Sequence, residues 1–299
     1  MNLKKLLPLI LILISLPAIS GGKKGRKYNG PFWHDFDFIN TRGKSIVYLP
    51  DDYDPKKKYP LVISLHGFGG SAGMQNTLFD FRPFTTTRQF ILINPDGMKG
   101  VGGLRFWNAT DFCCNYGNVD VDDVDYISDL IEGMSDEYSV DLKKVHIFGH
   151  SNGGFLAYRL ACDIPHKIAS LVSFAGVNWN DFSKCKGGEP IPVLHIHGTK
   201  DFLIKYPGTG KFPGAEKTVE QWVAHNNCAE QKVTSQTFND LKPLNMKVPF
   251  LKTTEKAWTD CDNGSEVRFW SVKGGDHVIS FNQEYLAKLL DHLLKFKKN

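Results

Sequence analysis

The chain has 299 residues, of which 41% are hydrophobic and 23% are charged. These proportions are typical of a globular protein with a hydrophobic core and exclude a disordered or collagen-like chain. The formal net charge of +4, from 36 Lys and Arg against 32 Asp and Glu, is mild. A nucleic-acid-binding protein is expected to gather basic residues into a patch or along one helix, so we expect no nucleic-acid partner.

The N-terminal segment has the organisation of an export signal. Two lysines precede an apolar run at residues 6–16, and small residues lead up to Ser20. This order is typical of a secretory signal peptide, and the run is shorter than the ~20 apolar residues that span a bilayer. A retained membrane-anchoring helix is the alternative. We expect residues 1–20 to be removed, residues 21–299 to form one domain, and the mature protein to be extracellular or periplasmic without a membrane anchor.

Short apolar runs alternate with amphipathic stretches along the rest of the chain. Strands are predicted at residues 44–49, 61–65, 90–93, 145–148, 168–174, 193–197 and 267–272. Helices are predicted at residues 123–134, 154–162, 215–226 and 283–296. This alternation predicts a single α/β domain with a parallel sheet covered on both faces. The polar stretch 229–259 is the least readable part, either an excursion near the site or a solvated flap.

Six cysteines lie beyond the predicted signal peptide. An even number of cysteines in an exported chain favours disulfide bonds, because the thiols reach an oxidising compartment. Their spacing does not form a zinc pattern of two close pairs. Cys228 and Cys261 flank one segment near the C-terminus and are predicted to pair. The pairing of the other four stays open: Cys113, Cys114, Cys162 and Cys185.

Ser151 lies in a Gly-x-Ser-x-Gly sequence at residues 149–153. The string alone is weak evidence, but here it falls directly between a predicted strand and a predicted helix. A serine on such a tight turn needs small flanking residues, and the helix start behind it presents free N–H groups to a developing anion. Ser151 is therefore the predicted nucleophile, and a glycine-rich turn with a bystander serine is the alternative.

A serine hydroxyl needs a base to take its proton and an acid to orient that base. Asp201 follows the predicted strand 193–197, and His277 follows the predicted strand 267–272. The chain order of serine, aspartate and histidine is that of the α/β-hydrolases and differs from the chymotrypsin and subtilisin orders. We predict Asp201 as the acid and His277 as the base, with Asp276 as the weaker candidate for the acid.

The remaining histidines near these motifs are weaker candidates for the base. His195 and His197 alternate within an apolar strand, which favours a place in the core or a supporting role behind the site. His150 adjoins the nucleophile, and on this turn its ring is expected to point away from Ser151 Oγ.

An acyl-transfer site also needs donors for the oxyanion. The backbone N–H of Asn152, the residue after the nucleophile, is one predicted donor. The second should come from the glycine-rich residues 66–70 after the strand 61–65. Phe68 is the predicted donor there and Gly67 is its competitor.

Acidic and aromatic clusters accompany these motifs. The acidic cluster fits helix capping better than a calcium loop and contains Asp120, Asp122, Asp123 and Asp125. Aromatic side chains follow several predicted strands and either line a cleft or pack at the sheet edge. Of these we predict Trp107, Trp179 and Phe202 as substrate-binding residues, with Tyr206 nearby.

These motifs together resemble the secreted α/β-hydrolases of the polyhydroxybutyrate depolymerase and feruloyl esterase type. The matching segments are 65–71, 107–108 with 113–114, 121–124, 149–154 with 158–162, 197–201 and 274–277. The resemblance implies an α/β-hydrolase fold, Ser151, Asp201 and His277 as the triad, and disulfides near the site. Members commonly continue with Trp-Pro after the histidine, whereas this chain has Val278 and Ile279. Polymer depolymerases of this type often have a separate polymer-binding domain, and we expect none in this chain.

The sequence thus predicts a secreted serine carboxylic-ester hydrolase that works through an acyl-enzyme and needs no metal or cofactor. The expected substrates are feruloyl or acetyl esters of plant polysaccharide, or polyhydroxybutyrate-type polyesters and oligomers. A serine peptidase of the same fold is one alternative. A catalytically silent binding protein is the other.

Overall fold

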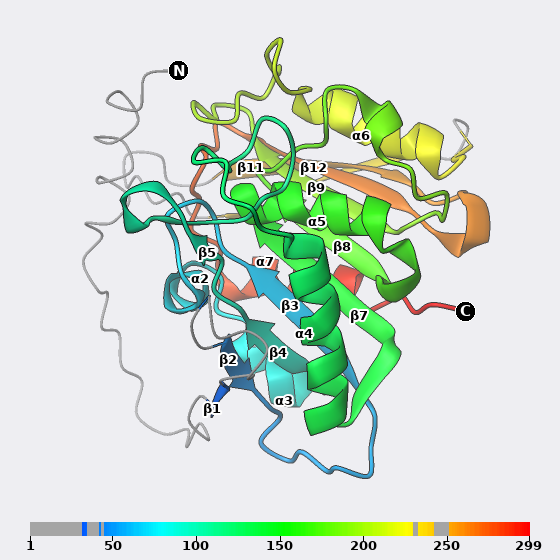
Figure 1. The fold of residues 1–299 in the computed structure, drawn as a ribbon. Helices are drawn as coiled ribbons and strands as arrows, with labels where there is room; N and C mark the ends of the chain where they lie inside the picture. The colour runs from blue at the N-terminus through cyan, green and yellow to red at the C-terminus, as the bar shows by residue number, and fades with distance from the viewer. Residues whose placement is uncertain (1–31, 35–41, 43–44, 230–232, 242–250) are drawn as a thin grey trace. The chain divides into compact units, whose positions relative to one another are not determined.

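The computed structural model describes residues 32–34, 42, 45–229, 233–241 and 251–299. The predicted signal peptide lies outside these residues. Within them, ten strands form one sheet in the order β1-β2-β4-β3-β7-β8-β9-β12-β11-β10 (Figure 1). The parallel centre consists of β4 (Ile91–Asn94), β3 (Tyr59–Leu65), β7 (Val140–His150), β8 (Ser170–Phe174), β9 (Val193–Gly198) and β12 (Val267–Lys273). This confirms the predicted α/β class and all seven predicted strands, which include β2 (Ser45–Tyr48).

Antiparallel strands extend both edges of the sheet. β1 (Phe32–His34) pairs with β2, and β2 pairs with β4. On the other side β11 (Leu251–Trp258) pairs with β12, and β10 (Val233–Leu241) pairs with β11. Where the structure describes the stretch 229–259, it forms two strands of the main sheet and is neither an excursion nor a flap. Its strands escape prediction because the buried face of β11 includes Thr253 and Glu255, which break the apolar alternation.

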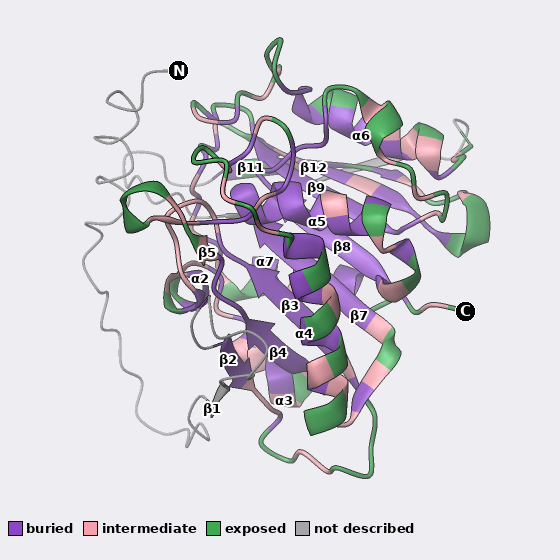
Figure 2. Cartoon of the chain, in the orientation of Figure 1, coloured by how far each residue is buried: buried purple, intermediate pink, exposed green. Residues whose placement is uncertain are grey.

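Helices cover both faces of the sheet. Two hydrophobic clusters show this, because Leu61, Ile63 and Leu65 of β3 belong to one and Val62 to the other. The first cluster includes α4 (Asp123–Glu137), α5 (Asn152–Asp163) and α6 (Ala215–His225), and the second includes α7 (Gln283–Leu293). The strands between them are buried along most of their length (Figure 2).

Shorter elements complete the described chain. The short helices are α2 (Ala72–Leu78), α3 (Thr85–Arg88), η3 (Arg82–Phe84), η4 (Val101–Gly103), η5 (Pro165–Lys167), η6 (Phe182–Lys184) and η8 (Asp262–Gly264). A two-stranded hairpin of β5 (Met98–Lys99) and β6 (Arg105–Phe106) leads into Trp107. No helix in the described part of the chain is long and apolar enough to cross a membrane.

All six cysteines form disulfides. Cys228 pairs with Cys261, as predicted. The pairings that the sequence leaves open are Cys162 with Cys185 and Cys113 with Cys114. The last two residues adjoin in sequence and are both buried.

Candidate active site

Ser151 lies on the sharp turn between β7 and α5. Its backbone has φ 54° and ψ −119°, a conformation that costs free energy in a residue with a side chain. A Cβ on Gly149 would lie 2.1 Å from the Gly153 carbonyl oxygen, and one on Gly153 would lie 2.3 Å from the Leu65 carbonyl oxygen. Backbone atoms therefore exclude any larger residue at both positions. This crowding is the physical basis of the Gly-x-Ser-x-Gly pattern.

The structure brings the three predicted triad side chains into direct contact. His277 Nε2 lies 2.8 Å from Ser151 Oγ, and His277 Nδ1 lies 2.8 Å from Asp201 Oδ2. The three residues follow β7, β9 and β12, whose carboxyl ends meet at one edge of the parallel sheet. Asp276 instead accepts a hydrogen bond from the backbone N–H of His277.

The carboxylate of Asp201 is surrounded by donors. Its Oδ1 accepts from the backbone N–H groups of Leu203 and Ile204 at 2.9 and 2.8 Å. Burial alone would raise the pKa of Asp201, but the charge of His277 and the hydrogen bonds from His197 and His277 hold this pKa well below its usual value. Asp201 is therefore ionised at neutral pH and can orient the imidazole.

A chain of buried hydrogen bonds continues behind Asp201. His197 Nε2 lies 2.7 Å from the Ile204 carbonyl oxygen and 3.3 Å from Asp201 Oδ2. Since both oxygens only accept, this nitrogen carries the proton in the neutral ring. His197 Nδ1 then accepts from His195 Nε2 at 3.2 Å, and His195 Nδ1 accepts from the Tyr158 hydroxyl at 2.8 Å. His195 and His197 thus have the supporting place that the sequence favoured for them.

His150 supports the backbone of His277. Its Nε2 lies 3.1 Å from the His277 carbonyl oxygen, to which it donates, and its ring stacks on Phe174. Burial, with a smaller effect of the His277 charge, lowers the pKa of His150 to about 3. The ring therefore stays neutral at working pH. It holds the backbone of His277 in place through this hydrogen bond.

The predicted oxyanion loop runs directly beside Ser151. A Cβ on Gly67 would lie 3.2 Å from the Ser151 Cβ. The Gly67 carbonyl oxygen accepts from His66 Nδ1 at 2.7 Å and from the Gly70 N–H at 3.0 Å. Because N–H and C=O of a trans peptide point in opposite directions, these bonds also fix the direction of the Phe68 N–H.

The backbone N–H groups around Ser151 differ in whether they already donate a hydrogen bond. The Gly69 N–H donates to the Arg105 carbonyl oxygen at 2.7 Å. For the N–H groups of Gly67, Phe68 and Asn152, the described residues provide no acceptor. Phe68 and Gly67 therefore both stay candidates for the second donor beside Asn152.

The predicted substrate-binding aromatics lie in three different environments. Trp107 is fully buried, and its indole N–H donates to the His66 carbonyl oxygen, so its burial does not fit contact with substrate. Trp179 is 8% exposed, whereas Phe202, next to Asp201, is 51% exposed. Tyr206 hydrogen bonds Ser271 on β12. Only Phe202 of the three predicted residues offers a large apolar surface.

The acidic cluster caps and anchors α4. The Asp122 side chain accepts from the N–H groups of Val124 and Asp125, as helix capping predicts. Asp123 is fully buried and pairs with Arg42 and the Asn108 N–H. The cluster therefore has a structural use in this fold.

Two known proteins are similar in sequence to most of this chain. Feruloyl esterase D of Neurospora crassa is 25% identical over 292 residues, which cover 90% of this chain and 87% of that protein. A bifunctional acetylxylan esterase/xylanase of Neocallimastix patriciarum is 26% identical over 245 residues, or 82% of this chain. This chain spans about a third of that relative, 32% of its length.

Among solved structures, a ferulic acid esterase of Anaeromyces mucronatus aligns with a TM-score of 0.56 at 18% identity, covering 94% of this chain and 95% of that one. An acetyl xylan esterase of Aspergillus awamori aligns with a TM-score of 0.59 at 16% identity, covering 86% and 98%. At this identity the likeness shows the fold alone, and it confirms the predicted α/β-hydrolase fold.

A family model matches residues 38–244, more than half of the chain. Its family is named Esterase and described as "Putative esterase". The matched range contains Ser151 and Asp201 and ends before His277. On this match, the chain belongs to the Esterase family.

Proposed function

We propose that the protein is a serine carboxylic-ester hydrolase that works through an acyl-enzyme. The observation that carries this proposal is the row of hydrogen bonds from Ser151 Oγ through His277 to Asp201, with 2.8 Å at each step. Membership in the Esterase family supports the ester as the bond that is cleaved. The intact row also argues against a silent binding protein of the same fold.

In the first half of the reaction, Ser151 Oγ attacks the ester carbonyl carbon while His277 Nε2 takes the serine proton. Asp201 stabilises the imidazolium that forms. The carbonyl oxygen becomes an oxyanion, for which the N–H groups of Asn152 and of the loop at Phe68 are the donors. When the tetrahedral intermediate collapses, the bond to the leaving alkoxide breaks and His277 returns the proton to that oxygen.

In the second half, water replaces the alcohol. His277 takes a proton from water while the water oxygen attacks the acyl carbon on Ser151. Collapse breaks the bond to Ser151 Oγ, which recovers its proton from His277. One ester and one water therefore give one acid and one alcohol, with the enzyme unchanged.

The proposed substrates are feruloyl or acetyl esters carried by plant polysaccharide. The names of the relatives, feruloyl esterase and acetylxylan esterase, support these over a hydroxybutyrate polyester. The three disulfides support a place outside the cell, in line with the export signal predicted at residues 1–20.

The test compares wild type with Ser151→Ala on p-nitrophenyl acetate, methyl ferulate, acetylated xylan and hydroxybutyrate oligomers. We expect turnover by wild type only, and covalent labelling of Ser151 by a serine-directed phosphonate, read by peptide mass spectrometry. Equal rates in the two proteins would overturn the proposal. Cleavage of peptide substrates faster than of every ester would replace it with a peptidase.

A further inference from the structure

The side chain of Asn152 forms a pair of hydrogen bonds with the backbone of Trp107. The Trp107 N–H donates to Asn152 Oδ1 at 2.7 Å, and Asn152 Nδ2 donates to the Trp107 carbonyl oxygen at 2.9 Å. Both residues are fully buried. The triad chemistry uses only the backbone of Asn152, so this amide side chain has no part in the reaction described above.

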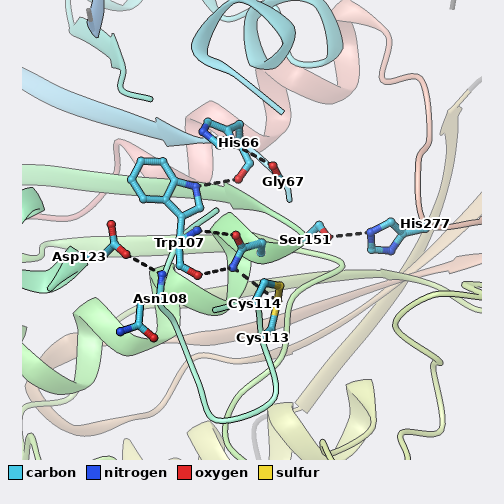
Figure 3. Close-up of a disulfide and its surroundings, with 10 residues drawn as sticks. His66, Gly67, Trp107, Asn108, Cys113, Cys114, Asp123, Ser151 and His277 are labelled. Atoms are coloured by element: carbon cyan, nitrogen blue, oxygen red, sulfur yellow. Dashed lines mark hydrogen bonds between the residues drawn. A yellow bond between two sulfur atoms is a disulfide. The ribbon is translucent and has the colours of Figure 1, made fainter. Parts of the chain in front are cut away.

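Trp107 also reaches the second oxyanion segment. Its indole Nε1 donates to the His66 carbonyl oxygen at 2.9 Å, and the rings of His66 and Trp107 lie 5.0 Å apart. The His66 carbonyl belongs to the peptide group that carries the Gly67 N–H. Figure 3 shows the bond from the Trp107 indole to His66. One residue therefore holds both the start of the oxyanion loop and the residue that follows the nucleophile.

The segment around Trp107 is itself anchored to the helices behind it. The Asn108 N–H donates to the buried carboxylate of Asp123 on α4 at 2.6 Å, and Arg159 on α5 donates to the Asn108 carbonyl oxygen at 2.7 Å. Asn152 Nδ2 lies 3.5 Å from the sulfur of Cys113, which is bonded to Cys114. The segment of Trp107 is thus bonded to two helices, and its partner Asn152 contacts the disulfide.

We propose that Trp107 and the Asn152 side chain are positioning residues that fix the two oxyanion donors relative to each other. The donors come from separate parts of the chain, the loop 66–70 and the start of α5, and Trp107 hydrogen bonds to both. An error of about 1 Å in such a site can cost about 100-fold in rate, so a rigid connection has a direct catalytic value. This inference rests on the proposed ester hydrolysis.

Two variants remove the connection. Asn152→Leu deletes both bonds to Trp107, and Trp107→Phe deletes the bond to His66. We expect each to lower kcat by about 10- to 100-fold with KM within about threefold of wild type, because the lost alignment acts on the transition state. Affinity for a boronic acid that forms a tetrahedral adduct with Ser151 should fall with kcat, whereas affinity for the product acid should not.

The chain offers matched controls for both variants. Asn226 is fully buried and bridges the backbone N–H and C=O of Ile191 at 3.2 and 2.7 Å, the same paired geometry far from Ser151 in sequence. Trp222 is fully buried and donates its indole N–H to Asn178 at 3.2 Å. Asn226→Leu and Trp222→Phe therefore remove comparable bonds, and we expect them to lower stability without the selective loss of kcat and boronate affinity.

A readout without turnover separates this inference from the proposed function. Gly69 and Gly70 of the loop, and Phe155 in the first turn of α5, have hydrogen-bonded amides. Hydrogen exchange at these three amides should become faster in Asn152→Leu and Trp107→Phe and stay unchanged in the controls. The positioning role is overturned if exchange is unchanged, or if kcat falls no more than in the controls. In that case the proposed ester hydrolysis still stands, provided that Ser151→Ala is inactive. If wild type cleaves no ester, the proposed function fails, and exchange still decides whether Trp107 orders the two segments.

Discussion

His197 Nε2 lies 3.3 Å from Asp201 Oδ2, the carboxylate oxygen that also accepts from His277. The base is thus oriented by an acid that has a second imidazole partner. Because a hydrogen bond to a charged group is worth about 1.5–3 kcal/mol, removing His197 should raise the pKa of Asp201 and weaken its hold on His277. The buried row of hydrogen bonds behind Asp201 should therefore affect the rate of the reaction.

For His197→Phe we expect kcat to fall about tenfold or more at neutral pH and the pH–rate profile to change, because the carboxylate that orients His277 loses one of its donors. His146→Phe is the control, because His146 is an equally buried histidine on β7 whose ring contacts Ser170 instead of the triad. Identical pH profiles for the two variants would contradict a role for His197.

Gly153→Ala should destabilise the protein by at least about 2 kcal/mol, because its Cβ would lie 2.3 Å from the Leu65 carbonyl oxygen. Gly188→Ala meets no atom within 4 Å and should change the free energy of unfolding by less than about 0.5 kcal/mol. Urea denaturation measures both. A Gly153→Ala protein as stable as wild type would show that the nucleophile turn relaxes more easily than its geometry indicates.

Acid should destabilise the fold through three buried histidines. Burial lowers the pKa of His66 to about 4 and that of His146 and His150 to about 3, against 6.5 for the free side chain. Between pH 6.5 and 4 the unfolded chain binds protons that the folded chain does not. The contribution of these histidines to the free energy of unfolding is therefore fully present above pH 6.5. It falls on acidification, by up to about 1.4 kcal/mol per pH unit for each group.

Urea denaturation between pH 7.5 and 4.5 tests this dependence. His146→Gln should remove one group's share of the slope, whereas His166→Gln, at an exposed position, should leave the slope unchanged. The assignment fails if wild type is equally stable across this range.

Two of the three disulfides should differ in what they stabilise. Cys162 and Cys185 are 23 positions apart, so their bond restricts the unfolded chain, and replacing both with Ala should cost about 3 kcal/mol. Cys113 and Cys114 are adjacent and close almost no loop. Replacing both with Ser should cost less stability but lower kcat through the contact of Cys113 with Asn152. Urea denaturation and steady-state kinetics on both double variants test this difference. A larger loss of stability in the Cys113/Cys114 variant, or an unchanged kcat in it, would contradict the prediction.

Phe202→Ala should raise KM for methyl ferulate more than for p-nitrophenyl acetate, because an exposed ring beside Asp201 can cover an aromatic acyl group. Leu142→Ala is the control, since Leu142 is also 51% exposed but lies near the beginning of β7, opposite the end that carries Ser151. Equal KM changes for the two esters would remove Phe202 from the substrate site.

The sequence predicts the triad contacts well because each member follows a strongly apolar strand or lies in a recognisable motif. No sequence pattern indicates which way an aromatic side chain points. The sequence therefore predicts Trp107 as a substrate-binding residue, although its side chain is buried in the core. The same limit applies to Asn152, whose side-chain partner is 45 positions away. β10 and β11 are missed because polar residues such as Glu255 occupy the inner face of β11.

The parallel order of β7, β9 and β12 also bears on how activity is acquired during folding. Ser151 and His277 are 126 positions apart, and β8 and β9 lie between the strands that carry them. No local hairpin or helix can form the site before these distant strands pair, and pairing over such separations is slow. Recovery of ester hydrolysis after dilution from denaturant should therefore lag behind the recovery of helical circular dichroism. The length of this lag would measure how long these strands take to pair.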